Sequence, residues 1–462
     1  MALPIARRAT RLSLPLIGAF AVGAIAYGGL YTFPAISVAL ASEFGISRTL
    51  AVTPWTMFLV VTAVASPLLG RAYDEWADRD LLTASMVLLA AGWLTVYLAR
   101  DISLVILAYA VFMALGLQLS FIGTSTAIAR RYAGMSGLAL GIAYAGPGIG
   151  VAIALPIAGG LIQTAGWRSS SLLFLATCLV GVAFVWLMTS GPAIIVPARR
   201  RSRPGPAGER PGSGLPGTRA TEAGLAARAS GLHETSAPGA VSAAHEVPPI
   251  GSGEHAHSVR RVVHTRRFWV LFAGAAAIGV FDEGLLQAFI PSAVNSGLGA
   301  EWAAAALGLQ SLAYVGGQIV GGGLSDRIGR RIVGVFAAAA VAGGVVAALG
   351  LVASAPGLAI AGVIFHGIGT GATIAVRSAA FGDVFGGTSF GSIFGLLGVA
   401  YPVGGTLAVY AGAIAFDTTG SYLPLIPVIL AALGLWSVAL WIAGPRRSPV
   451  TVAGTSRRGR TA

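Results

Sequence analysis

The sequence predicts an all-α membrane protein whose twelve transmembrane helices form two pseudo-symmetric six-helix bundles. Of its 462 residues, 55% are hydrophobic and only 10% are charged, with a mean hydropathy of +0.80, whereas a soluble domain carries roughly 25% charged residues. Apolar runs of about 20 residues, the length that crosses a bilayer core, recur along the chain. Short patterns in the first half return in the second half. These three observations together exclude an ordinary soluble domain.

The first helix is predicted over Leu16–Leu40, an apolar run preceded by Arg7, Arg8 and Arg11. A secretory signal has an apolar region of only about 7–15 residues, so this run is too long for one. The remaining spans are predicted at 50–70, 81–99, 104–129, 136–163, 171–190, 268–293, 302–321, 332–354, 357–382, 391–416 and 423–443.

The segment 191–267 separates the two sets of spans and differs from them in composition. It is rich in Pro, Gly, Ala, Ser and Arg and has few large apolar residues, so we expect a disordered linker. The predicted organisation is a bundle at 1–190, this linker, a bundle at 268–443 and a tail at 444–462.

The distribution of arginine predicts the orientation. Arg supplies all 30 basic residues, and with both termini inside, 26 of them lie in inside segments against three in outside loops. Because positive residues are retained on the cytoplasmic side, both termini are expected in the cytoplasm of an inner-membrane, multi-pass protein. The same rule explains the net charge of +13 without a nucleic-acid partner. We expect a monomer surrounded by membrane lipid.

Three pairs of short patterns indicate that the halves are repeats. Gly70-x-x-x-Asp74 matches Gly322-x-x-x-Asp326 at an offset of 252 residues. Gly29-Leu30 returns at an offset of 255 and Gly166 at an offset of 254. Two repeated six-helix units are typical of transporters whose site lies between the units near the midplane of the membrane.

The stretch Gly-Gly-Leu-Ser-Asp-Arg-Ile-Gly-Arg-Arg at Gly322–Arg331 resembles the loop between the second and third helices of each half in the major facilitator superfamily. The counterpart at 70–79 has lost the second glycine and two basic positions. Further stretches, Tyr27–Arg48, Gly137–Ala143 and Phe416–Tyr422, are similar to bacterial monocarboxylate-transporter-like and oxalate/formate-antiporter-like proteins. This resemblance implies alternating access and a small-molecule substrate.

The sequence departs from that branch at two cations. The resemblance implies an arginine eight residues before Asp326 and a lysine in the eleventh helix, but these positions hold Gln318 and Tyr401. Both of these polar residues are further candidates for contact with substrate. The resemblance therefore supports a small organic anion without specifying oxalate or lactate. It also implies that Tyr27 and Tyr31 of the first helix contact substrate, although their spacing fits aromatic packing equally.

Ionisable residues inside the apolar runs are the main candidates for function. A charge at the bilayer centre costs roughly 2.5–3.5 kcal/mol on insertion scales, so one that is kept usually faces a water-filled path. Asp282 and Glu283 are candidates for proton coupling, with structural carboxylates as the alternative. Since adjacent helical residues point about 100° apart, we expect the two carboxylates to face different surroundings.

The tenth helix carries a polar stripe of His366, Thr370, Thr373 and Arg377 at steps of four, three and four. Arg377, with its planar fork, is the candidate anchor for an anionic substrate or for an acid of the seventh helix. The alternatives are a structural ion pair with Asp282 or Asp383, or snorkelling to the surface. Thr373 is a further substrate candidate. His366 is either a proton relay or a packing residue.

A second set of charged residues is expected to act in gating. The set consists of Asp74, Arg79, Asp326, Arg330 and Arg331, next to the predicted short inside turns. Ion pairs that form in one arrangement of the lobes and break in the other would bias alternating access. The alternative is that these arginines only hold the turns inside.

The function that fits best is a secondary transporter of a monocarboxylate or other small organic anion, with proton coupling as an addition. Multidrug or metabolite efflux is the first alternative, suggested by the glycine-rich stretch 146–150 and the missing cations. A transporter-like receptor or scaffold is the second. Without a metal-ligand cluster in the spans or a phosphate-binding loop with its lysine, we expect neither a cofactor nor an enzyme.

Overall fold

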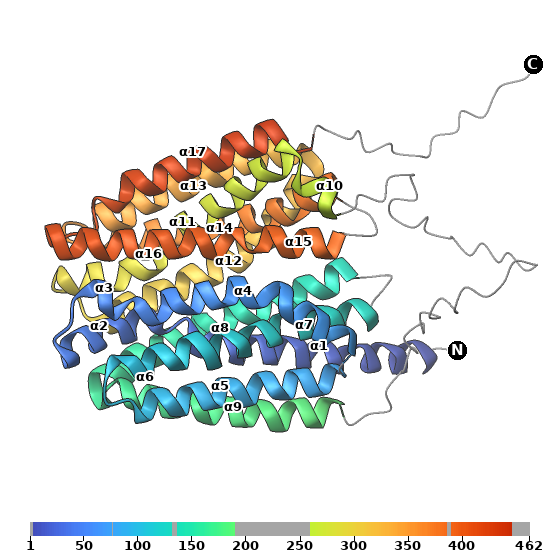
Figure 1. The fold of residues 1–462 in the computed structure, drawn as a ribbon, viewed down its shortest axis with the longest axis horizontal. Helices are drawn as coiled ribbons and strands as arrows, with labels where there is room; N and C mark the ends of the chain where they lie inside the picture. The colour runs from blue at the N-terminus through green and yellow to red at the C-terminus, as the bar shows by residue number, and fades with distance from the viewer. Residues whose placement is uncertain (1–2, 76, 132–135, 190–258, 386–389, 446–462) are drawn as a thin grey trace, which may run out of the picture. The chain divides into compact units, whose positions relative to one another are not determined.

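The computed structural model describes residues 3–75, 77–131, 136–189, 259–385 and 390–445, and these residues form helices and short connections without a strand. The predicted all-α fold is confirmed. Figure 1 shows the helices of the first half, blue to green, grouped together, and those of the second half, yellow to red, grouped likewise. The disorder expected for 191–258 and the tail after 445 lie outside the described residues.

The elements of the first half are α1 (Leu3–Leu30), α2 (Phe33–Phe44), α3 (Arg48–Ala51), α4 (Thr53–Glu75), α5 (Asp78–Leu98), α6 (Ile102–Leu107), the π-helical η1 (Ala108–Met113), α7 (Ala114–Arg131), α8 (Ser136–Ala165) and α9 (Trp167–Thr189). Those of the second half are α10 (Val259–Val263), α11 (Arg266–Asn295), α12 (Ala300–Ile328), α13 (Arg330–Gly350), α14 (Pro356–Phe385), α15 (Phe390–Gly398), α16 (Ala400–Thr419) and α17 (Leu425–Ala443).

Eleven segments of the described chain are long and apolar enough to cross a membrane. The predicted second span corresponds to α4, in which the apolar stretch Thr53–Ser66 is shorter. Residues 259–267, assigned by composition to the linker, contain α10 and the first two residues of α11.

The span predicted over Leu16–Leu40 is found as one apolar span, Leu16–Phe44, but its helix is interrupted at Tyr31 and Thr32 between α1 and α2. Pro34 has no N–H to continue the ladder. The Thr32 hydroxyl instead donates to the Gly29 carbonyl at 2.6 Å.

The predicted eleventh helix is also divided, into α15 and α16. The division at Val399 precedes Pro402, whose missing N–H leaves the carbonyl four residues earlier without its helical partner. Tyr401 therefore lies in the first turn of α16. The predicted fourth helix contains the π-helical turn η1, a local widening that is common at functional sites.

The motif Gly322–Arg331 is expected to form a short turn, but most of its residues are helical. Residues up to Ile328 belong to α12, and α13 begins at Arg330. The direction of the chain changes at Gly329, whose φ of 102° is a conformation that residues with a Cβ rarely adopt. The charged residues of the motif consequently lie on the ends of two helices.

Close helix contacts in the second half depend on glycine. A Cβ on Gly279 of α11 would lie 2.0 Å from the Tyr401 carbonyl oxygen, and one on Gly404 of α16 would lie 1.8 Å from the Ala276 carbonyl oxygen. Small residues let membrane helices approach until their backbones touch. This contact sets the distance between the acidic turn of α11 and the start of α16.

The glycines in the stretch 146–150 of α8 likewise allow close helix contacts within the first half. A Cβ on Gly146 would meet the Phe20 carbonyl of α1 at 2.2 Å, and one on Gly150 would meet the Ala24 carbonyl at 2.1 Å. The two halves also touch each other, through α8 with α12 and through α4 with α16.

Candidate functional site

Both acidic side chains of α11 meet a single tyrosine. The Tyr401 hydroxyl lies 2.8 Å from Asp282 Oδ2 and 3.1 Å from Glu283 Oε1. The two carboxylates therefore share this one hydroxyl, while Glu283 alone also accepts a hydrogen bond from Trp55. Asp and Glu differ in length, so side chains that leave the helix about 100° apart can still reach one donor placed between them. Asp282 is 6% exposed and Glu283 is fully buried.

Glu283 also accepts a hydrogen bond from the other half of the molecule. Trp55 Nε1 of α4 donates to Glu283 Oε2 at 2.8 Å, and the Trp55 ring is fully buried. Both oxygens of this carboxylate are thus occupied, one from each bundle. A charge-assisted bond of this kind is roughly twice as strong as one between neutral groups. It joins the two halves directly at the predicted site.

Aromatic rings extend the cluster along the first half. Tyr27 and Tyr31 stack with their centroids 5.7 Å apart, and Tyr31 meets Trp55 edge-on at 5.2 Å. Phe33 stacks on the other side of the Trp55 ring at 5.5 Å. The two tyrosines that the resemblance assigns to substrate therefore lie next to the Trp55–Glu283 bond, and they also pack as the spacing of four predicts.

Arg377 of α14 approaches the same tyrosine from another side. Its guanidinium carbon lies 5.9 Å from the centroid of the Tyr401 ring, within the range of a cation–π interaction. Its Nε is buried and has no hydrogen-bond partner in the structure. Within the described residues, no carboxylate oxygen lies within 4.0 Å of an Arg377 nitrogen. The alternative of a direct ion pair with Asp282 or Asp383 is therefore not seen among the described residues.

His366 is enclosed among three helices of the second bundle. Its Nδ1 lies 3.3 Å from Gln310 Nε2, and its Nε2 lies 3.2 Å from the Phe281 carbonyl oxygen. A neutral ring protonated on Nε2 satisfies both contacts, since the amide donates to Nδ1 and Nε2 donates to the carbonyl. The ring thus binds the backbone immediately before Asp282 and not its carboxylate. This geometry suits positioning of the acidic turn.

The remaining substrate candidates line the same region with less contact. Thr373 is fully buried, and its hydroxyl has no hydrogen-bond partner in the structure. Gln318 of α12 is half-buried. Tyr314, one helical turn before Gln318, interacts electrostatically with both Arg377 and Asp282. Buried hydroxyl and guanidinium atoms without partners are what a polar ligand would satisfy.

The charged motif in the second half forms a network between helix ends. Arg330 of α13 is paired with Asp326 of α12, and its Nε lies 3.3 Å from Asp383 Oδ2 of α14. It also donates to the Ser325 hydroxyl at 2.6 Å. Arg331 donates to the Gly444 carbonyl at 3.1 Å, so it engages α17 instead of an acid. The role of this network in gating stays a prediction.

The first-half counterpart is simpler where it is described. Arg79 lies 3.8 Å from Asp80 Oδ1 and 4.4 Å from the centroid of the Trp186 ring. The side chain of Asp74 lies outside the described residues, so its predicted pairing is not seen.

A second contact between the halves lies near the C-terminal end of α16, away from the helix ends that carry the Gly322–Arg331 motif. The two carboxylate oxygens of Asp417 accept the backbone N–H groups of Arg48 and Thr49, each at 2.9 Å. These amides begin the short helix α3, whose unpaired N–H groups favour an acid. Asp417 thereby ties α16 to the turn before α4.

Sequence reasoning missed three residues of these sites: Trp55, Tyr314 and Asp417. Trp55 and Tyr314 lie in apolar runs and read as packing residues. Asp417 lies in the stretch Phe416–Tyr422, which indicates a family resemblance but no contact. A buried indole or phenol carries one polar atom that must find a partner, but the sequence does not show which helix supplies it.

The comparisons with known proteins agree with this architecture. The family model described as Major Facilitator Superfamily matches residues 17–309 and 272–461. The riboflavin transporter RibJ of Trypanosoma brucei brucei is 34% identical over 116 residues, 25% of this chain and 21% of that protein. Monocarboxylate transporter 11 of Homo sapiens is 28% identical over 163 residues, 35% of this chain and 34% of that protein. The matched stretches thus span a fifth to a third of these relatives.

Proposed function

Because the chain belongs to the Major Facilitator Superfamily of membrane transporters, we propose that it moves a small organic anion by alternating access around the cluster of Asp282, Glu283, Tyr401 and Arg377. The family makes the chain a transporter and not an enzyme, in agreement with the sequence. The substrate and the coupling ion are the parts that we propose.

The proposal that the substrate is an anion rests on the surroundings of Arg377. A guanidinium held within a transmembrane helix is costly unless an opposite charge or water accompanies it. The described residues supply no ion pair, and Nε lacks a partner. A carboxylate of the substrate would fit the planar fork and form the direct ion pair that no described acid forms with Arg377. A monocarboxylate transporter among the matched relatives supports the same class.

Alternating access requires contacts that hold one conformation and release in the other. Two such contacts join the halves: the bond from Trp55 to Glu283 and the bonds from Arg48 and Thr49 to Asp417. Both must break when the bundles separate on that side. Glu283 would then lose its indole donor, which links its charge state to the conformation.

Proton coupling is proposed through the pair of acids. Two carboxylates that share one hydroxyl repel each other when both are charged, and one bound proton relieves this repulsion. With that proton, the pair carries a single negative charge opposite Arg377. Breaking the hydrogen bond from Trp55 to Glu283 would change the free-energy cost of keeping the remaining negative charge on the pair. Substrate and proton could therefore act on the same conformational equilibrium.

The test is uptake in proteoliposomes. Radiolabelled short-chain monocarboxylates are offered with and without an inward proton gradient, to the parent protein and to Arg377→Gln. Arg260→Gln is the matched control, because it removes the same charge from an exposed position on α10. We expect Arg377→Gln to abolish uptake and Arg260→Gln to retain it. Equal uptake by both variants would remove Arg377 as the anchor.

Coupling is tested separately with Asp282→Asn and Glu283→Gln. If the proton passes through this pair, at least one variant should retain substrate counterflow but lose the response to the proton gradient. Gradient-driven uptake that persists in both variants would exclude these acids.

A second candidate is export of a planar aromatic metabolite. The stacked Tyr27 and Tyr31 beside Trp55 offer ring faces for such a solute. One matched relative is a riboflavin transporter. Efflux of riboflavin from loaded vesicles distinguishes this candidate from anion uptake. No contact among the described residues favours the receptor or scaffold alternative.

A further inference from the structure

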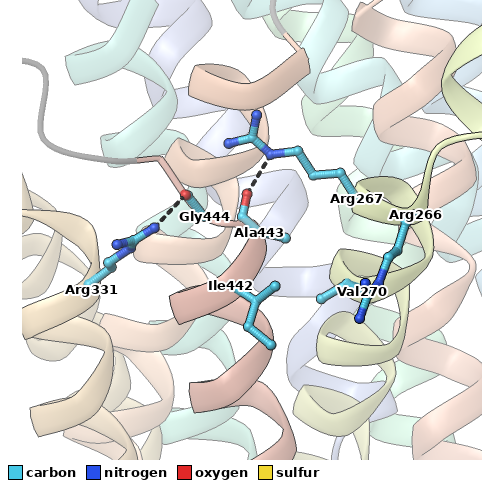
Figure 2. Close-up of a pocket in the computed structure, with 7 residues that line it drawn as sticks. All are labelled: Arg266, Arg267, Val270, Arg331, Ile442, Ala443 and Gly444. Atoms are coloured by element: carbon cyan, nitrogen blue, oxygen red, sulfur yellow. Dashed lines mark hydrogen bonds between the residues drawn. The ribbon is translucent and has the colours of Figure 1, made fainter.

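A cavity of about 550 Å³ opens at the end of the second bundle where α11 and α13 begin and α17 ends. Three arginines line it, Arg266 and Arg267 from α11 and Arg331 from α13, and none of the described residues that line it is acidic. Figure 2 shows Arg267 and Arg331 reaching from opposite sides toward the last carbonyls of α17. This cavity is remote in the fold from the Tyr401 cluster.

The simplest role of these arginines is to cap α17. Arg267 Nε donates to the Ala443 carbonyl at 2.7 Å, and Arg331 donates to the Gly444 carbonyl at 3.1 Å. Cations near a helix C-terminus commonly do this. Each bond uses one of the several N–H groups of a guanidinium, so donors remain. Arg331 Nε is buried and has no hydrogen-bond partner in the structure.

Among the described residues that line the cavity, no acidic group balances its positive charge. The neighbouring Arg330 differs, because Asp326 and Asp383 neutralise it. Arg331 instead engages a carbonyl and lies 5.3 Å from the centroid of the Trp441 ring. A cavity with three cations, spare donors and no acid is suited to an anion.

The surroundings place the cavity at the level of lipid headgroups. Trp269 and Trp441 are 54% and 56% exposed, and exposed tryptophans gather at the interface between membrane and water. Ile442, which lines the cavity, is 61% exposed. In Figure 2, Ile442 and Val270 lie next to each other, between Arg331 on one side and Arg266 on the other, with Arg267 above them. The arrangement therefore has a cationic end beside an apolar wall that lipid chains can reach.

We propose that this cavity binds the phosphate of an anionic phospholipid, held by Arg266, Arg267 and Arg331, with an acyl chain along Val270 and Ile442. A guanidinium fork binds phosphate oxygens in pairs. Basic pockets between transmembrane helices on the cytoplasmic side are suited to such headgroups. Bound lipid would tie the first turn of α11 to the start of α13 and the end of α17. This site is independent of the transported substrate.

The test is lipid binding by the purified full chain. Native mass spectrometry counts the lipids retained with phosphatidylglycerol or phosphatidylcholine, and melting in detergent reports the stabilisation by each. The variant is Arg266→Gln with Arg267→Gln. The control, Arg260→Gln with Arg327→Gln, removes the same charge from exposed positions that do not line the cavity. A further variant, Arg267→Lys, keeps the charge but loses the planar fork.

We expect a retained phosphatidylglycerol that phosphatidylcholine does not replace. The double variant in the cavity should weaken its binding about 30-fold, since each basic residue near the surface contributes about 1 kcal/mol. The control should retain the lipid, and Arg267→Lys should lie between them. Equal losses in the two double variants would show general surface attraction and overturn the site. Stabilisation by inorganic phosphate alone, at matched ionic strength, would overturn the assignment to lipid.

Discussion

Replacement of Trp55 by phenylalanine tests whether the bond to Glu283 holds the two bundles in the conformation seen here. The variant keeps an aromatic ring among Phe33 and Phe58 but removes the N–H that lies 2.8 Å from Glu283 Oε2. Since this donor and its acceptor belong to different bundles, separation of the bundles must break the bond. Its loss should therefore favour the opened conformation.

The magnitude follows from the kind of bond. A hydrogen bond to a charged group contributes about 1.5–3 kcal/mol. The ratio of opened to closed molecules should then rise roughly 10- to 150-fold, because each 1.4 kcal/mol is a factor of ten. The Tyr401 hydroxyl stays 3.1 Å from Glu283 Oε1, although its single hydrogen is shared with Asp282, which lies 2.8 Å away.

The assay is the labelling rate of a cysteine placed at Ala413. This residue of α16 is 1% exposed and belongs to the same hydrophobic cluster as Trp55. The native Cys178, which is buried, is first replaced by alanine. A membrane-impermeant maleimide reaches a cysteine at 413 only in opened molecules, so the rate is proportional to the opened fraction even when that fraction is small.

The control is Trp436→Phe. Trp436 is fully buried, and its Nε1 has no hydrogen-bond partner in the structure, so this variant removes a similar ring without a bond. A cavity effect common to both variants therefore cancels. If Trp55→Phe and Trp436→Phe change the labelling rate equally, the bond to Glu283 does not stabilise the closed conformation and the reasoning fails.

Three further outcomes are expected. Asp417→Asn should raise the same labelling rate about 2- to 10-fold, because it weakens partly exposed bonds between the halves; Thr418→Ala, which alters only bonds within α16, should leave it unchanged. Arg330→Gln should change the uptake rate while lowering the free energy of unfolding, measured by SDS titration, by no more than about 1 kcal/mol per ion pair; a larger loss would make the network structural. The Ser103 hydroxyl and the Leu104 amide hold the pKa of Asp101 below its usual range, so its contribution to stability is present above about pH 4 and is lost as the pH falls through the folded-state pKa. Asp101→Asn should make the melting temperature less sensitive to acid below about pH 4, and an unchanged acid sensitivity would contradict this account.

The sequence by itself determined the class of the protein and most of its helices. Length and hydropathy are local properties, and an apolar run of about 20 residues forms a spanning helix whatever its neighbours are. The rarity of charge in those runs was enough to select Asp282, Glu283 and Arg377. The motif at Gly322–Arg331 indicated the family that the comparison then showed.

Breaks within helices were less predictable. Pro34 and Pro402 are visible in the sequence, but membrane helices also accommodate proline without dividing. Whether a helix breaks at a proline depends on which hydrogen-bond donors satisfy the carbonyl groups that the proline leaves without a partner. The breaks at Tyr31–Thr32 and at Val399 lie next to the phenols of Tyr31 and Tyr401, which interact with the acidic side chains of α11.

Only the tertiary structure decided which groups meet. The angle between neighbouring side chains indicated that Asp282 and Glu283 diverge, yet the close approach of α11 and α16 at Gly279 and Gly404 places one hydroxyl within reach of both. Trp55 lies 228 residues from Glu283 in the chain. Periodicity records which face of a helix is polar, but a hydrogen bond depends on positions to within a few tenths of an ångström, and the packing of other helices sets those positions.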